Sequence, residues 1–365
     1  MQHARLSTRN NILTIAIGMA LGMGACGAGA DNSPATKAWM GSSILEEQAA
    51  ASTDTGREAV AHKRATALIA AMTLEQKLQQ LTGAVPEIVP ELPQCKGARH
   101  VRGIAALKIP TFRITNGPVG LGQNDCVSAS VPPKMVTFGG TLIDSTAYTD
   151  PSSAKATALP SAMAAAASFD PSVAGSYGDV IGTEMLNLAL HEFEAPGMNL
   201  ARLPILGRNF EYFGEDPFLS GTMSVAEIKA IQAKGLIGMA KHYVGNEQET
   251  NRQTIQETID RQVLRELYLL PFEMSVKDGK VASIMCAYNY VNGLPSCESK
   301  EILTDVLRND WGFTGYVQSD FFATKTTVGP MNAGMDFMMP TPLQWSPAAL
   351  NSALAAGTIT LAQID

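Results

Sequence analysis

The sequence predicts an α/β fold on a parallel sheet, more specifically a closed (β/α)8, TIM-like barrel. Short apolar runs alternate with helical patterns along the chain, and the runs are apolar throughout, as in parallel strands buried on both faces. Polar side chains follow many successive runs, and only a closed ring brings so many strand ends to one place. An open nucleotide-binding sheet would carry Gly-x-Gly-x-x-Gly between an early strand and a helix, and no such junction carries it.

The first 30 residues are predicted to be a secretory signal peptide. Arg5 and Arg9 precede an apolar stretch, residues 12–25, that is too short and too rich in glycine for a comfortable membrane span. Two processing routes stay open: cleavage after Ala30, or lipid attachment at Cys26, where the preceding residues resemble a bacterial lipoprotein box. Either route predicts a secreted or periplasmic mature chain without a membrane-spanning segment.

The rest of the chain is predicted to form a linker and one domain. Residues 31–58 are aperiodic and rich in Ala, Ser, Thr and Gly, which predicts a flexible linker before a globular domain over residues 59–365. Helical spacing over residues 65–81 predicts the first helix, and Thr73 to Gln76 resembles a capping box that restarts it. Later helical patterns cover residues 172–189, 221–233, 261–276 and 300–309. Strand-like runs cover residues 109–114, 195–200, 235–244, 281–287, 315–319 and 335–339.

Four cysteines remain when Cys26 is set aside. Outside the cytoplasm disulfides persist, and four cysteines allow three connectivities. We expect Cys95 to pair with Cys126 and Cys286 with Cys297, because each pair closes a short local loop that contains Gly and Pro. Buried free thiols are the alternative.

Composition and charge narrow the classes of function. The chain has 45% hydrophobic and 17% charged residues, which is ordinary for a globular protein with a large core. The net charge of −7 comes without a basic stripe, so no nucleic-acid partner is expected. No metal or other cofactor is expected, because the sequence has neither Cys-x-x-Cys nor clustered His. A small neutral substrate fits this composition better.

Polar side chains with catalytic potential follow the predicted strands. Asp320 ends an apolar run, where a barrel strand delivers a catalytic acid, although a lone Asp there also commonly caps the next helix. The others that follow strand-like runs are Asn116, Arg202, Lys241, His242 and Tyr288. Cations can donate to sugar hydroxyls and a carboxylate can attack an anomeric carbon, so the set suits a polyhydroxylated ring.

Each of these side chains also has a plain structural explanation. Lys241 and His242 can be satisfied by local carbonyls, and Arg202 can bridge to an acid such as Glu194. Tyr288 can be a core aromatic residue whose hydroxyl finds a backbone partner. Their joint placement at strand ends favours a functional site.

Several motifs resemble those of the family 3 glycoside hydrolases, the β-glucosidase group. The most specific are Asn199-Leu200-Ala201-Arg202-Leu203-Pro204 and Gly207-Arg208-Asn209-Phe210-Glu211-Tyr212-Phe213-Gly214-Glu215-Asp216-Pro217. Further matches are Lys241-His242-Tyr243, Arg265-Glu266-Leu267-Tyr268, Met285-Cys286-Ala287-Tyr288-Asn289 and Ser319-Asp320. The resemblance covers residues 59–365 and implies the N-terminal barrel domain of that family.

The resemblance implies roles for individual residues. Asp320 is implied as the nucleophile of a retaining hydrolysis of β-linked glycosides. Arg202, Lys241 and His242 are implied as ligands of the sugar, with Tyr288 close to the nucleophile. By the same resemblance a second group is expected to be structural and to bind loops together by charge: Arg208, Glu211, Glu215 and Asp216.

The chain departs from the family pattern at two binding positions. Asn116 stands where an Asp usually grips the outer hydroxyls of the sugar, so we expect a weaker or altered sugar preference, since an amide lacks charge-assisted strength. Phe321 stands where many relatives carry Trp, which predicts a smaller stacking face for the leaving sugar.

The second carboxyl of the reaction is the larger departure. A retaining hydrolase needs a general acid about 5 Å from the nucleophile, and in two-domain relatives it comes from a following α/β sandwich. That domain is expected to be absent, with the barrel truncated near residue 365. The loop over residues 244–252 has no His, which argues against the subclass that cleaves N-acetylglucosaminides; Glu247 or Glu249 could substitute as the acid.

Three functions remain open at this stage. The first is a β-glucosidase-like hydrolase acting through Asp320, whose acid/base is missing from this chain. The second is a β-xylosidase-type enzyme on the same scaffold. The third is a catalytically silent sugar-binding protein that keeps the cationic ligands of the sugar but lacks acid catalysis.

Overall fold

The computed structural model describes residues 54–84, 100–122 and 156–365, together with the backbone of four short strands between these ranges. Those strands are β1 (Ile88–Val89), β2 (Leu92–Lys96), β4 (Met135–Phe138) and β5 (Thr141–Asp144). The predicted signal peptide, the lipid site at Cys26 and the pairing of Cys95 with Cys126 lie outside the described residues. The chain divides into two compact units, Met1–Leu68 and Ile69–Asp365, and everything below from residue 69 onward belongs to the second.

A five-stranded parallel sheet organises the second unit. Its strands lie in the order β12 (Tyr316–Ser319), β9 (Ser283–Cys286), β7 (Ile237–Tyr243), β6 (Glu192–Glu194) and β3 (Ile114–Asn116). Isolated parallel bridges continue the pairing beyond β12, from Gln318 to Phe337 and from Met338 to Thr82. The predicted parallel α/β architecture is therefore confirmed, and the described pairings do not by themselves close a ring.

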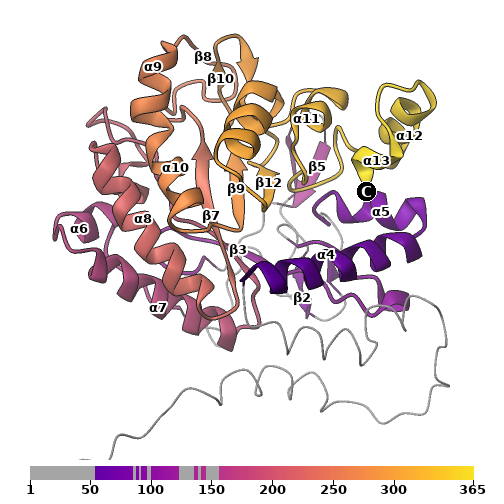
Figure 1. Ribbon diagram of the computed structural model, residues 1–365, viewed down its shortest axis with the longest axis horizontal. Coiled ribbons are helices and arrows are strands. Elements are labelled where there is room, and N and C mark those ends of the chain that lie inside the picture. Colours follow the sequence, from indigo (N-terminus) through magenta and orange to yellow (C-terminus); the bar gives the residue numbers. More distant parts are fainter. Residues whose placement is uncertain are drawn as a thin grey trace, which may run out of the picture. The chain divides into compact units, whose positions relative to one another are not determined.

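Helices cover the sheet as a parallel fold requires. Figure 1 shows α7 (Pro171–Asn187), α8 (Pro217–Gln232) and α10 (Leu270–Lys277) packed along one side of the central strands. Both α7 and α8 begin with an Asp cap followed by Pro at the first turn, where a missing N–H costs nothing. The predicted helices at residues 172–189 and 221–233 are confirmed within a few residues.

Two other predicted helical regions contain π-helix. The region predicted as residues 261–276 comprises α9 (Arg261–Val263), the π-helical turn η3 (Leu264–Tyr268) and α10. Pro271 at the start of α10 has no N–H to donate, and just before it the Leu269 N–H bonds five residues back to Leu264. The region predicted as 300–309 is the π-helix η5 (Glu301–Asp310).

The N-terminal helices also follow the sequence signals. Helix α4 (Asp54–Ala71) begins before the domain start expected at residue 59, and α5 (Leu74–Gln80) follows it. Thr73 and Gln76 form the predicted capping box, with the Thr73 hydroxyl accepting the Gln76 N–H and the Gln76 amide accepting the Thr73 N–H.

Three predicted strands differ from the structure. The runs at 109–114 and 195–200 contain Pro110 and Pro196, which cannot donate to a sheet ladder. Strand β3 accordingly begins only at Ile114, and β6 ends at Glu194. The run at 335–339 contributes isolated bridges rather than a strand.

The remaining elements with assigned bounds are η1 (Ala105–Leu107), α6 (Ala162–Ala166), η2 (Asn209–Glu211), β8 (Gln256–Glu257), β10 (Tyr290–Val291), β11 (Leu294–Pro295), η4 (Ser296–Glu298), α11 (Val328–Ala333), α12 (Pro347–Ala355) and α13 (Leu361–Ile364).

Large aromatic side chains and one disulfide fix the core around β7 and β9. Tyr243 lies edge-on against Phe272 and Trp311, and all three are buried. Cys286 at the end of β9 is bonded to Cys297, as predicted. Within the described part of the chain, no helix combines the length and the apolar character that a membrane span needs.

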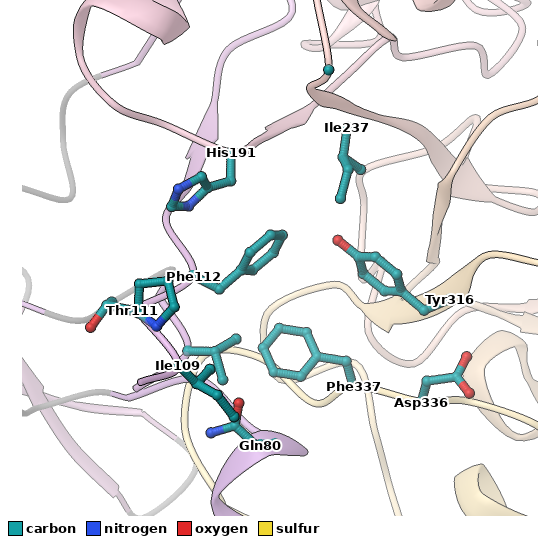
Figure 2. Close-up of a pocket in the computed structure, with 12 residues that line it drawn as sticks. Gln80, Ile109, Thr111, Phe112, His191, Ile237, Tyr316, Asp336 and Phe337 are labelled. Atoms are coloured by element: carbon teal, nitrogen blue, oxygen red, sulfur yellow. The ribbon is translucent and has the colours of Figure 1, made fainter. Parts of the chain in front are cut away.

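The N-terminal ends of the strands border an apolar cavity of about 610 Å³. Figure 2 shows Phe112, Tyr316 and Phe337 facing this space, with His191 stacked on Phe112 at 5.6 Å between ring centroids. Among the described residues that line it, Asp336 is the one acid, and it is paired with Arg308. This part of the lining offers no unpaired acid, and the candidate chemistry lies at the opposite strand ends.

Candidate active site

A small pocket of about 190 Å³ lies at the carboxyl ends of the parallel strands. Asn116 ends β3, Glu194 ends β6, and Asp320 directly follows β12, so each is delivered by a different strand. Six of the seven residues predicted for the site line this one pocket: Asn116, Lys241, His242, Tyr288, Asp320 and Phe321. The described lining is completed by Glu194, Arg208, Arg252 and Met285.

Asp320 is held by its own strand and its neighbour. Its N–H donates to the Cys286 carbonyl at 3.0 Å, which continues the pairing of β12 with β9. Its Oδ1 accepts the Phe321 N–H at 2.7 Å, and its side chain is 12% exposed. Oδ2 lies 3.8 Å from His242 Nε2. One carboxylate oxygen is thus fixed by the backbone, and the other lies beside the imidazole.

His242 is held as a neutral imidazole with a defined tautomer. The Asn199 amide nitrogen donates to the His242 carbonyl and to Glu247, so Asn199 Oδ1 is fixed as an acceptor. That oxygen lies 3.1 Å from Nδ1, which therefore carries the proton, while Nε2 accepts from Arg208 Nη2 at 2.8 Å. Burial, then the charges of Arg208 and Lys241, lower the pKa of His242 well below its ordinary value. Its contact with Asp320 is therefore not an ion pair.

Arg208 is the central cation of the pocket. Its Nε and Nη2 each donate to the Glu211 carboxylate at 2.9 Å, and Nη1 lies 3.4 Å from Glu249. Burial opposes ionisation of Glu211, but Lys241 and Arg208 outweigh it and hold the pKa of that carboxyl below its ordinary value. Arg208 thus remains charged, orients His242, and lines the pocket. Arg208 binds Glu211 and Glu249 by charge, as expected for a structural residue, and it also lines the pocket.

Tyr288 lies between Asp320 and Arg252. Burial, then the negative charge of Asp320, raise the pKa of Tyr288 well above its ordinary value. Arg252 Cζ lies 4.3 Å from the centroid of the Tyr288 ring, and its Nη1 donates to Glu249 at 2.7 Å. The phenol therefore keeps its proton in the pocket that Asp320 also lines.

Lys241 and Asn116 form the other wall of the pocket. Lys241 is 2% exposed, and its Nζ donates to Asn116 Oδ1 at 2.7 Å. Burial lowers the pKa of Lys241, and the negative charges of Glu211 and Glu194 partly oppose that effect. The described lining thus combines an ammonium, two guanidinium groups and an amide with the carboxyl groups of Asp320 and Glu194. Such an arrangement can bind several hydroxyls of a single sugar ring beside a nucleophile.

Comparison with known proteins identifies the family. Residues 150–365, more than half of the chain, match the family model described as the glycosyl hydrolase family 3 N terminal domain. The chain belongs to glycosyl hydrolase family 3.

Similar proteins carry the names of glycosidases. An exo-alpha-(1->6)-L-arabinopyranosidase of Bifidobacterium longum is 33% identical over 80% of this chain and 35% of its own length. Thermostable beta-glucosidase B of Acetivibrio thermocellus is 35% identical over 66% of this chain and 30% of its own. The structure of beta-glucosidase 3B from Thermotoga neapolitana in complex with glycerol superposes with a TM-score of 0.71 at 29% identity, over 82% of this chain and 40% of that one. The chain spans about a third of the length of the curated relatives it matches.

Arg202 lies away from the family 3 pocket described above. It lines a separate cavity of about 460 Å³, which Glu247 also lines, and donates to the Tyr268 hydroxyl. The sequence suggested otherwise because Arg202 follows an apolar run, whereas β6 ends eight residues earlier, at Glu194. The role of Arg202 as a ligand of the sugar therefore stays a prediction, and among the described arginines Arg208 and Arg252 line the pocket.

The residues that sequence reasoning missed had detectable signals. Arg208 stands in the quoted Gly207-Arg208-Asn209-Phe210-Glu211 motif of family 3, beside the Arg202 that was preferred to it. Glu194 directly precedes Ala195 and Pro196, which mark the true end of β6. Arg252 ends the loop over residues 244–252, which follows Lys241 and His242. Its place in the pocket depends on how that loop folds.

Proposed function

We propose that this chain contributes the sugar-binding and nucleophile-bearing part of a hydrolase of terminal β-linked glycosides, β-glucosidase-like, that acts with retention. The single observation that carries the proposal is Asp320, with one oxygen fixed by the Phe321 N–H and the carboxylate lying beside His242 and Tyr288 in a pocket lined by cations. The names of the family 3 relatives support the reaction class.

Asp320 is proposed to act by double displacement. A carboxylate oxygen of Asp320 attacks the anomeric carbon and forms a glycosyl ester, while the bond to the leaving oxygen breaks and that oxygen takes a proton from a general acid. Water, deprotonated by the same group, then attacks the anomeric carbon and releases Asp320 as a carboxylate. The Phe321 N–H keeps the carboxylate oriented in both steps, and Tyr288 lines the same pocket.

The acid/base is proposed to come from outside the described pocket. Glu247 lines the other cavity and accepts hydrogen bonds from Asn199 and the Leu200 N–H. Glu249 accepts from Arg208, Arg252 and Asn246. Glu194, the second carboxyl of the described lining, accepts from Gln318 at 2.8 Å. Because these three carboxyl groups are already engaged in hydrogen bonds, we do not assign any of them as the general acid/base. A following domain, as the sequence suggested, remains the proposed source of that group.

The sugar class, the full architecture and the location are part of the same proposal. The substrate is proposed to be a small glycoside of a pyranose sugar, with glucosides first and xylosides as the alternative. The parallel strand order and the bridges at Gln318 and Thr82 support a closed (β/α)8 barrel. The Cys286–Cys297 disulfide supports a secreted or periplasmic location.

A mechanism-based label tests Asp320. A 2,4-dinitrophenyl 2-deoxy-2-fluoro-β-glucoside has a leaving group that needs little protonation, so it reports on the nucleophile without the acid. We expect a burst of dinitrophenolate and a fluoroglucosyl ester on the peptide that contains Asp320. Asp320→Asn should reduce the rate of labelling by roughly 10⁴-fold, whereas Asp305→Asn, at a half-exposed helix position paired with Lys300, should leave it unchanged. Glucose binding without any burst would instead support the silent sugar-binding protein.

A further inference from the structure

The loop over residues 244–252 brings Arg252 to the pocket without a helix or strand of its own. It follows β7, and Arg252 at its end lines the pocket. The backbone hydrogen bonds inside the loop are short turns, from the Glu247 N–H to Gly245 and from the Arg252 N–H to Glu249. The position of the Arg252 guanidinium therefore depends on its side-chain contacts.

Arg252 is the less constrained of the two arginines that line the pocket. Its side chain is 34% exposed, against 17% for Arg208. Arg208 is bound by both oxygens of Glu211. Among the described residues, Glu249 is the one carboxylate that pairs with Arg252. Removing the charge of Glu249 should therefore free Arg252 and leave Arg208 in place.

Glu249 connects Arg252 to the rest of the pocket through both carboxylate oxygens. Oε2 accepts from Arg252 Nη1 at 2.7 Å. Oε1 accepts from the Asn246 amide at 3.1 Å and from Arg208 Nη1 at 3.4 Å. Asn246 is fully buried, so this bridge is anchored in the interior of the protein. The reaction proposed above gives Glu249 no chemical step, and these contacts point to a different role.

The bridge places a guanidinium where it can bind a sugar. Arg252 Cζ lies 4.3 Å from the centroid of the Tyr288 ring, a distance at which an aromatic ring attracts a cation. The bond to Glu249 occupies one Arg252 donor and leaves others for a ligand in the pocket that Asp320 also lines. We propose that Glu249 is a positioning residue that holds Arg252 on Tyr288 and thereby sets the affinity of the pocket for its sugar. This inference rests on the proposed glycosidase function.

Inactivation of the full chain by the dinitrophenyl fluoroglucoside separates binding from chemistry. The half-saturation concentration reports sugar binding, and the limiting rate reports attack by Asp320. No ion pair joins Arg252 to Asp320 in the part of the chain that the structure describes, so Glu249→Gln should change the limiting rate less than about threefold. We expect it to raise the half-saturation concentration roughly tenfold, because a charge-assisted hydrogen bond is lost from a side chain that is 24% exposed. The matched control is Glu273→Gln, at a 30% exposed carboxylate paired with Lys277 on α10, and it should change neither value.

Chemical rescue distinguishes positioning from a merely structural role. Arg252→Ala should weaken sugar binding as Glu249→Gln does. Free guanidinium ion should restore binding to Arg252→Ala, because Glu249 and Tyr288 hold the ion in the vacated place. The double variant Arg252→Ala/Glu249→Gln should not respond. An equal response of the two variants overturns the inference, and so does a half-saturation concentration for Glu249→Gln within about twofold of the wild type.

The outcomes separate this inference from the proposed function. If the fluoroglucoside labels Asp320 in the wild type and Glu249→Gln changes nothing, only the positioning role falls. If the wild type is not labelled but binds glucose, titration calorimetry with glucose measures the same loss of affinity, and the assignment of the nucleophile falls alone. If the wild type is not labelled and does not bind glucose, both proposals fall together.

Discussion

Replacing Arg208 by Lys separates charge from geometry at the centre of the pocket. The guanidinium bonds Glu211 twice and also bonds Glu249 and His242, whereas one ammonium cannot reproduce that fork. At least two charge-assisted hydrogen bonds are lost, each worth about 1.5–3 kcal/mol. The side chains of Arg208 and Glu211 are 17% and 10% exposed, so water replaces few of the lost hydrogen bonds. The Lys ammonium restores part of the lost stabilisation. We expect a net loss of roughly 2–3 kcal/mol in the free energy of unfolding.

The same change should slow the first chemical step. Without the Arg208 donor, His242 Nε2 loses the bond that fixes the ring beside Asp320, and the pocket loses a preorganised donor. Loss of one such donor costs on the order of 10²-fold in rate. The burst rate with a dinitrophenyl β-glycoside measures this effect, and urea unfolding measures the stability.

Arg261→Lys is the matched control for this prediction. Arg261 is 77% exposed and pairs with Glu301, so the same substitution there should change neither quantity measurably. A burst rate for Arg208→Lys within about threefold of the wild type, with unchanged unfolding, would show that the fork neither holds His242 nor stabilises the fold.

Two further predictions concern the stability of the scaffold. Burial raises the pKa of Glu227 to about 8, so the folded protein retains a proton that the unfolded chain releases above about pH 4.5, and stability falls as pH rises between these values. Glu227→Gln should therefore raise the free energy of unfolding by up to about 4 kcal/mol at pH 8 and hardly at pH 4.5. The same substitution at the exposed Glu266 should change the free energy of unfolding at neither pH. Urea unfolding that gives the same gain for Glu227→Gln at both pH values would contradict the prediction. Reduction of the Cys286–Cys297 bond, which closes a short loop beside Asp320, should lower the free energy of unfolding by about 3 kcal/mol, and identical urea curves with and without dithiothreitol would refute it.

Sequence patterns predicted the elements whose residues carry strong local signals. The capping box at Thr73, the helices α7 and α8, and the strand that delivers Asp320 follow from short-range rules of capping, periodicity and burial. The disulfide between Cys286 and Cys297 followed from the short loop between them. The boundaries of β3 and β6 were misplaced, because apolar character alone does not reveal where a proline interrupts the ladder.

The sequence predicted the chemical character of the candidate site, but it did not predict all of the residues that line the pocket. The sequence placed Asp320 and Lys241 at strand ends, and the parallel sheet brings both to one pocket. It could not decide between Arg202 and Arg208, since both stand in one irregular loop, where the direction of a side chain depends on distant partners. Arg208 faces the pocket because Glu211 and His242 hold it there, and Arg202 is bound by Tyr268 in the neighbouring cavity.

The amino-acid sequence by itself determined the fold class, the family motifs and the identity of the carboxylate at the end of β12, because these depend on local patterns. Only the tertiary structure decided the tautomer of His242, the orientation of the Asn116 amide and the hydrogen bond between Lys241 and Asn116. Each of those states is set by hydrogen bonds between strands and loops that are distant in the chain. The sequence pattern shows which polar side chains are present, and the three-dimensional packing determines which of their atoms donate and which accept hydrogen bonds.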